Sequence, residues 1–156
     1  MNTAEAYSPA TDTWRTLPAL PTARYALAGA TAPCPKDVEG LRGICVYAIG
    51  GFTGASWPDS AFDTSTVEAY SPATNTWKTL PGLPTARSQL AASTAPCPKG
   101  IERLKGACVY AIGGAFGDTV EAYSPATNTW QTLPSLGTGR DARGRRPRPV
   151  PRAWKG

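Results

Sequence analysis

Short runs of β-branched and aromatic residues alternate along the chain with turn-forming residues, a pattern typical of short strands. The run VEAYS at 67–71 is followed by PATN and then by TWKTL at 76–80. Pro72 suits the second position of a turn, and Asn75 tolerates a positive φ. We therefore expect these two runs to form an antiparallel hairpin.

Two further strands precede each such hairpin. The run SQLAASTA at 88–95 consists largely of small residues. The run ACVYAIGG at 107–114 has apolar residues at successive positions, so both faces of the strand would be apolar. A strand that is apolar on both faces is expected to be covered on both sides. Between them, GIERLKG at 100–106 offers five residues between glycines, too few to nucleate a helix. The pattern therefore predicts four strands in each unit and almost no helix.

The unit is repeated. TVEAYSPATNTW occurs at 66–77 and again at 119–130, and TAEAYSPATDTW at 3–14 differs at two positions. The segment at 16–51 returns with the same spacing at 79–114. The tyrosines of the three copies, Tyr7, Tyr70 and Tyr123, are 63 and 53 residues apart, because FTGASWPDSAFDTS in one loop is replaced by AFGD in the next. A long repeat of this kind indicates a fold built by stacking one structural unit.

Four-stranded antiparallel sheets that are apolar on both faces have to stack on one another, and a strand of small residues suits the crowded position near a common axis. This is the design of an all-β propeller blade. The repeat also resembles the kelch repeat of β-propeller proteins in three features: paired glycines, a Tyr and a Trp with six residues between them, and an arginine before the innermost strand. These features fall at Gly50-Gly51 and Gly113-Gly114, at Tyr7/Trp14, Tyr70/Trp77 and Tyr123/Trp130, and at Arg24, Arg87 and Arg140.

The resemblance covers residues 3–140 and implies about two and a half blades. Within a partial kelch propeller at 1–136 we expect a half blade at 3–17 and whole blades at 22–80 and 85–133. The resemblance to kelch propellers implies a closed ring of blades, and such a ring needs at least four blades. The open ends would leave apolar faces and strand edges uncovered, which predicts self-association.

The formal charge of +5 is carried by the tail. Residues 1–136 hold nine basic and ten acidic side chains, whereas residues 137–156 hold seven basic and one acidic, a balance of +6. Because no excess of Lys and Arg falls on the body, we expect no nucleic-acid partner and no membrane partner. The longest apolar run, ICVYAI, is far shorter than a membrane helix needs, and the N-terminus lacks the features of a secretory signal.

The repeat pattern stops after Arg140, and an arginine- and proline-rich composition predicts a disordered tail at 137–156. Gly144 to Pro151 can be encoded so that a one-base shift almost restores ASTAPCP. We therefore expect a truncated or frameshifted fragment of a longer propeller. The alternative is an arginine-rich arm that binds nucleic acid or an anionic membrane.

The four cysteines fall in two pairs, each separated by 11 residues. Repeat symmetry favours pairing Cys34 with Cys45 and Cys97 with Cys108, because each pair flanks the loop of an antiparallel hairpin. Buried free thiols are the alternative, and a shared metal site is disfavoured because the pairs belong to separate blades. Bridged cysteines would place the protein outside the cytosol or in a secreted form.

The sequence contains no histidine, which removes the usual general base and the usual metal ligand. We therefore expect no catalytic residue, no metal and no cofactor. Some kelch propellers are similar to copper oxidases. A copper oxidase needs imidazole ligands for its metal, and this chain has no histidine to supply them. Any enzyme activity would have to reside on blades outside this sequence, as in a secreted propeller enzyme or carbohydrate-active protein.

The favoured role is a non-catalytic interaction scaffold that binds protein or carbohydrate through loops on one face. The loop entering the first strand of a blade and the loop leaving the second lie on the same face, and loops on rigid scaffolds commonly bind ligands. Aromatics and arginine are common anchors, although packing of Trp57 and internal bonding of the arginines are the alternatives. The candidate binding residues are Arg24, Phe52, Trp57, Asp59, Phe62, Arg87, Phe116 and Asp118.

Overall fold

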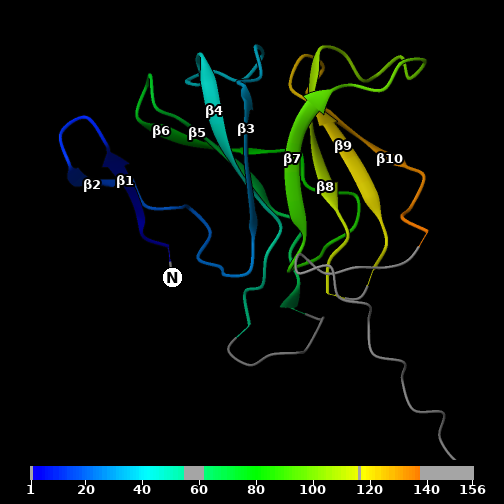
Figure 1. The fold of residues 1–156 in the computed structure, drawn as a ribbon, viewed down its shortest axis with the longest axis horizontal. Coiled ribbons are helices and arrows are strands. Elements are labelled where there is room, and N and C mark those ends of the chain that lie inside the picture. Colours follow the sequence, from blue (N-terminus) through cyan, green and yellow to red (C-terminus); the bar gives the residue numbers. More distant parts are fainter. Residues whose placement is uncertain (1, 55–61, 116, 138–156) are drawn as a thin grey trace, which may run out of the picture.

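The computed structural model describes residues 2–54, 62–115 and 117–137, and these residues form three antiparallel sheets with no α-helix among them. Figure 1 shows the two larger sheets side by side, with a smaller hairpin beside them at the N-terminal end. The predicted all-β class of propeller blades is confirmed. No helix within the described residues is long and apolar enough to span a membrane.

Each larger sheet has four strands, as the sequence pattern predicts. We call them blade A and blade B. Blade A has the order β3-β4-β5-β6, and blade B has the order β7-β8-β9-β10. The strands of blade A are β3 (Ala28–Pro33), β4 (Ile44–Ile49), β5 (Val67–Ser71) and β6 (Thr76–Leu80). Those of blade B are β7 (Ala91–Pro96), β8 (Ala107–Ile112), β9 (Val120–Ser124) and β10 (Thr129–Leu133).

The smaller sheet is the hairpin of β1 (Ala4–Ser8) and β2 (Thr13–Leu17), which we call the half blade. It repeats the β5–β6 and β9–β10 hairpins, in which Asn75 and Asn128 close the turn at φ 54° and 52°. Their side chains accept hydrogen bonds from Tyr70 and Tyr123 at 2.7 and 2.5 Å. The positive φ expected of Asn75 is thus present, and it is stabilised by a neighbouring tyrosine.

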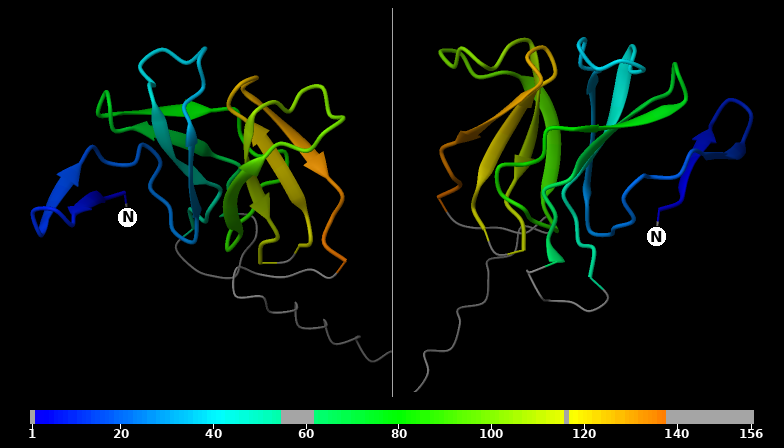
Figure 2. Two further views of the ribbon diagram at one scale, coloured as in Figure 1. Left: turned by 45° about the horizontal axis from the view of Figure 1, so that its top comes forward. Right: turned by 180° about the vertical axis from the view of Figure 1, so that it is seen from behind.

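Blades A and B pack face to face through their inner strands, and Figure 2 shows β3 beside β7 from two further directions. Small side chains on these strands permit the approach, and Thr94 Oγ1 donates a hydrogen bond to the Thr31 carbonyl at 2.7 Å. Between the sheets, the rings of Tyr47 and Tyr123 lie 5.9 Å apart. Burial raises the pKa of both phenols, which is consistent with a water-poor interface.

In blade A and in blade B, a tryptophan joins the outer part of the sheet to the sheet that precedes it in the chain. Trp77 Nε1 donates to the Pro18 carbonyl, just past the half blade, and Trp130 Nε1 donates to the Pro81 carbonyl, just past blade A. Both distances are 2.8 Å. The same bond therefore forms at both junctions between consecutive sheets.

The paired glycines at the end of β4 allow blade B to approach closely. Gly50 has φ 61°, and a Cβ placed on it would lie 2.5 Å from the Arg87 carbonyl oxygen. The neighbouring Gly51 has φ 116° and donates its N–H to that same oxygen at 3.0 Å. Only glycine satisfies both the backbone angle and the contact.

Two disulfides close the hairpins at the other end of the sheets. The Cα atoms of Cys34 and Cys45 are 5.0 Å apart, and those of Cys97 and Cys108 are 4.9 Å apart, with bonded sulfurs in both pairs. The pairing expected from repeat symmetry is the one that the structure contains. In each disulfide, the cysteine that directly follows the inner strand is bonded to a cysteine within the neighbouring strand.

We predict that reduction will destabilise the protein. Each disulfide closes a loop with a sequence separation of 11, which corresponds to about 2–3 kcal/mol of unfolding free energy. Urea unfolding with and without reductant measures the change, and peptide mapping without reductant should yield the two bridged pairs. Alkylation of all four cysteines without reductant would contradict the pairing.

We also predict that Gly50→Ala will destabilise the fold far more than Gly43→Ala. Both glycines have positive φ, 61° and 74°, but a Cβ on Gly43 would meet no atom within 4 Å. Gly43→Ala should therefore cost about 1 kcal/mol of backbone strain, and Gly50→Ala several kcal/mol because the clash adds to the strain. Urea midpoints of the two variants decide it, and equal costs would show that the close approach is unimportant.

Candidate functional site

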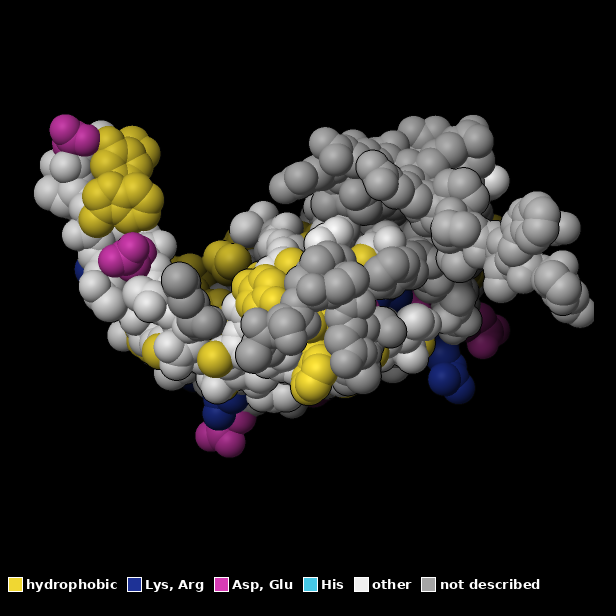
Figure 3. Space-filling view, turned by 90° about the horizontal axis from the view of Figure 1, so that it is seen from below, with side chains coloured by type: hydrophobic (Ala, Val, Ile, Leu, Met, Phe, Trp, Pro, Cys, Tyr) yellow, Lys and Arg dark blue, Asp and Glu magenta, His cyan; other side chains and the backbone are white. Residues whose placement is uncertain are grey.

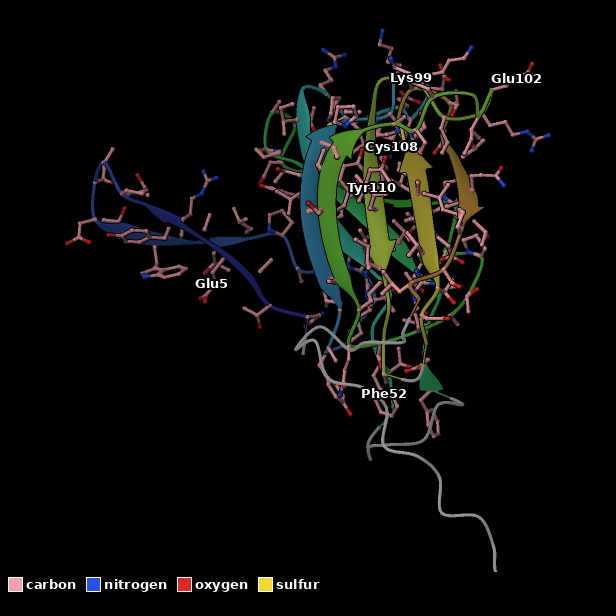
Figure 4. All side chains as sticks on the ribbon, turned by 45° about the vertical axis from the view of Figure 1, so that its right-hand side comes forward. Glu5, Phe52, Lys99, Glu102, Cys108 and Tyr110 are labelled. Atoms are coloured by element: carbon pink, nitrogen blue, oxygen red, sulfur yellow. A yellow bond between two sulfur atoms is a disulfide. The ribbon has the colours of Figure 1, made fainter. Side chains whose placement is uncertain are left out.

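The end of the blades that carries the paired glycines, which we call the glycine end, gathers the loops expected to bind a ligand. Tyr25 and Phe52 exchange backbone hydrogen bonds of 3.1 and 2.8 Å, and Phe52 also bridges to Asp63. The loop entering the first strand therefore does lie beside the loop leaving the second, as expected. Figure 4 shows Phe52 at this end of the sheets, with Lys99 and Glu102 at the opposite end.

Three aromatic side chains form a cluster at the glycine end of blade A. The ring of Phe52 lies 5.2 Å from that of Tyr25 and 6.0 Å from that of Phe62. Phe52 is fully buried, whereas Tyr25 and Phe62 are 44% and 45% exposed. The buried ring supports the other two, so both can contact a ligand with little loss of side-chain entropy.

Arg24 lies beneath this cluster and is buried. Its Nη1 pairs with Glu68 Oε2 at 2.5 Å, and both side chains have no exposed surface. Its Nε and Nη2 donate to the carbonyls of Gly50 and Ala48 at 2.8 and 3.0 Å. Thr22 Oγ1 donates to the second oxygen of Glu68 at 2.8 Å. The guanidinium thus satisfies carbonyls at the end of β4, and every polar atom of the ion pair has a partner.

Arg87 repeats this arrangement in blade B with fewer partners. It pairs with Glu121 at 2.5 Å, and its Nη2 donates to the Ala111 carbonyl at 3.1 Å. Arg87 Nε and Glu121 Oε1 are buried and have no hydrogen-bond partner among the residues that the structure describes. A buried polar atom without a partner loses solvation that nothing restores. Blade B therefore holds a less satisfied ion pair than blade A.

A cavity of about 320 Å³ opens at the glycine end between the two blades. Arg87 and Asp63 contribute opposite charges to its wall, and Asp63 Oδ1 is a further buried oxygen for which the described part of the chain supplies no partner. Asp63 directly follows the exposed Phe62, so the cavity adjoins the aromatic cluster. The lining residues are Asp63, Thr85, Ala86, Arg87, Gly114, Ala115, Gly117 and Thr119.

The structure therefore divides the candidate residues. Phe62 is exposed, Phe52 lies under it, and the two arginines are engaged within the protein, so their binding role stays a prediction. Asp118 is half-buried, and its carbonyl accepts a hydrogen bond from Leu136 N at 2.8 Å. The other three candidates lie outside the described residues: Trp57, Asp59 and Phe116.

Three residues that matter at this end were absent from the candidates: Tyr25, Glu68 and Glu121. A usable signal existed for the two glutamates, because the same Glu stands between Val and Ala in both full repeats, as the same Arg does before the inner strand. A buried arginine requires a carboxylate, and each repeat offers this one. No group of side chains among the described residues has the composition and proximity of a metal site.

Four-stranded sheets with an inner strand of small residues, stacked face to face, are the blades of a β-propeller. A protein-family model described as the kelch motif matches residues 45–84 and 106–137, one stretch in each blade. Both blades of this chain thus match the kelch motif, over 72 of its 156 residues. The search of curated proteins gives no match. Kelch repeats are generally non-catalytic and typically mediate protein interactions.

We predict that Arg24→Met will destabilise the protein by about 3–5 kcal/mol, because it leaves the Glu68 carboxylate buried and unpaired. The double variant Arg24→Met/Glu68→Leu removes both charges and should recover part of that loss, because the Gly50 and Ala48 carbonyls still lack the Arg24 donors. Urea unfolding of the two variants and of Glu68→Leu completes the cycle. If the double variant were as unstable as the sum of the single variants, the two side chains would not be coupled.

Proposed function

We propose that the chain is a non-catalytic scaffold that binds a protein ligand through the glycine end of its blades. The observation that carries this proposal is the cluster of Tyr25 and Phe62, half-exposed on top of the buried Phe52 and next to the cavity wall at Asp63. Exposed aromatics held rigidly beside a charged cavity are typical anchors of protein interfaces. The Arg24–Glu68 ion pair below them holds the loops in place, and Arg87 contributes to the cavity wall.

A carbohydrate ligand is the other candidate, because a sugar ring can pack on the exposed faces of Tyr25 and Phe62. The two disulfides favour an oxidising compartment, where glycans are abundant. The cavity volume and its two charges suit a polar ligand of either class. A propeller enzyme whose catalytic residues lie outside this sequence remains the alternative role.

Binding can be tested with a displayed peptide library and a glycan array, each probed with the full chain. For any ligand found, we predict that Tyr25→Ala and Phe62→Ala will each weaken binding by about tenfold or more. Trp57→Ala, predicted from the sequence alone, should act in the same direction without loss of the fold. Ile44→Ala is a matched control, because Ile44 is also exposed but lies at the opposite end of β4.

The affinities of these variants, measured by calorimetry, separate the possibilities. Binding of a peptide that depends on Tyr25 and Phe62 supports the protein-binding role, and binding of a glycan with the same dependence supports the carbohydrate role. A ligand whose affinity is unchanged in both variants would place the binding surface elsewhere.

A further inference from the structure

The junction between blades A and B contains two contacts that depend on repeated residues. Trp130 of blade B donates to the Pro81 carbonyl that leaves blade A, and Tyr123 of blade B packs on Tyr47 of blade A. The tryptophan contact recurs where Trp77 of blade A meets Pro18 after the half blade. In both junctions the later sheet supplies the Trp and the earlier sheet supplies the carbonyl.

The half blade presents the later-sheet side of such a junction, and no sheet among the described residues packs on it. Tyr7 and Trp14 are the repeat equivalents of Tyr123 and Trp130, yet they are 44% and 70% exposed, whereas Tyr123 is fully buried. Figure 3 shows hydrophobic side chains gathered on this projecting hairpin. The rings of Tyr7 and Trp14 are 5.2 Å apart, the same separation as between Tyr123 and the partly buried Trp130 in blade B. The exposed pair is therefore already arranged as in a formed junction.

Blade B presents the earlier-sheet side of a junction, and within residues 2–54, 62–115 and 117–137 no sheet covers it. Tyr110 is the repeat equivalent of Tyr47, which is 1% exposed, but Tyr110 itself remains partly exposed. Both tyrosines donate to a proline carbonyl at 2.7 Å, so Tyr110 has the orientation that Tyr47 has in the packed junction. Figure 4 shows Tyr110 on β8. The other partly exposed equivalents on this face are Ile112, Val120 and Leu133, whose counterparts Ile49, Val67 and Leu80 are buried.

The proline carbonyl needed for the tryptophan contact is present at this end as well. Pro134 follows β10 as Pro81 follows β6 and Pro18 follows β2. Pro134 is exposed, and within the described residues its carbonyl accepts no hydrogen bond. The two ends of the chain therefore offer the donor and the acceptor of the same junction.

We propose that a second copy of this chain docks head to tail, so that the half blade of one copy packs on the open face of blade B of the other. Trp14 Nε1 then donates to the Pro134 carbonyl, and Tyr7 packs on Tyr110. A second copy is the occupant because the junction inside the chain is built from these same repeated residues. The contact joins two different surfaces, so it is heterologous and extends into a ring or an open chain of copies.

Assembly through these faces is independent of ligand binding at the glycine end. The full chain is studied by sedimentation over a wide range of concentrations. We expect the wild type to associate as concentration rises, and Trp14→Ala and Tyr110→Ala each to sediment as monomers. Trp14→Phe, which keeps an aromatic ring but loses the N–H donor and part of the ring surface, should associate at least about three- to tenfold more weakly. Tyr25→Ala is the matched control, since Tyr25 is as exposed as Tyr7 but lies at the glycine end.

An equimolar mixture of Trp14→Ala and Tyr110→Ala distinguishes the geometry. Each variant retains the face that the other has lost, so the mixture should form a one-to-one dimer that does not grow further. Formation of that dimer also shows that both variants are folded. A wild type that stays monomeric at every concentration overturns the proposal. So does a Tyr110→Ala variant that dimerises alone, because that outcome means that like faces pair.

Discussion

The rest of the structure depends on one constraint: each blade is a sheet whose two faces are both apolar. Such a sheet is stable only when another sheet covers each face, and the packed junction between blades A and B shows how this is done. The inner strands carry small residues so that β3 can lie beside β7, and Tyr47 and Tyr123 fill the space further out. At the edge of the junction, a tryptophan N–H supplies a directional contact that fixes the relative position of the sheets.

Close stacking brings backbone carbonyls of the strand ends into a region without water, and the buried arginines resolve that conflict. Arg24 bonds the carbonyls of Ala48 and Gly50 while Glu68 balances its charge. Replacing an ion pair by apolar residues is often tolerated elsewhere, but here the cation also serves carbonyls that an apolar residue would leave unpaired. The arrangement makes the base of the loops at the glycine end rigid, and it explains why the arginines are buried although they stand next to those loops.

Much of the fold can be predicted from the sequence because the same pattern of strands and turns recurs in each copy of the repeat. The hairpin turns at Asn75 and Asn128, the four strands of each unit and the cysteine pairing all depend on local chemistry or on repeat symmetry, and the structure contains them. The burial of Glu68 was harder to foresee. In VEAYS the glutamate alternates with apolar residues as an exposed side chain would, so its burial is indicated only by the repeated arginine that needs a carboxylate and by the stacking of sheets on both faces.

The candidate site was less accessible to prediction because it depends on residues that differ between repeats. Tyr25 is replaced by Ser88 in the next unit, so symmetry gives no indication of its role. Its contact with Phe52 joins two loops that are distant in sequence, and neither loop alone indicates which ring is buried and which is exposed.

The loop after the paired glycines is closed in the same way in both blades despite its different length. Gly50 N donates to the Thr66 carbonyl at 2.9 Å, and Gly113 N donates to the Thr119 carbonyl at 2.8 Å. Those pairs are 16 and 6 positions apart, a difference of ten residues, and the strands that follow keep the same register. Insertions at this position can therefore change the surface of the glycine end without disturbing the sheet. Natural variation and protein engineering can both use it to exchange one loop for another on an unaltered framework.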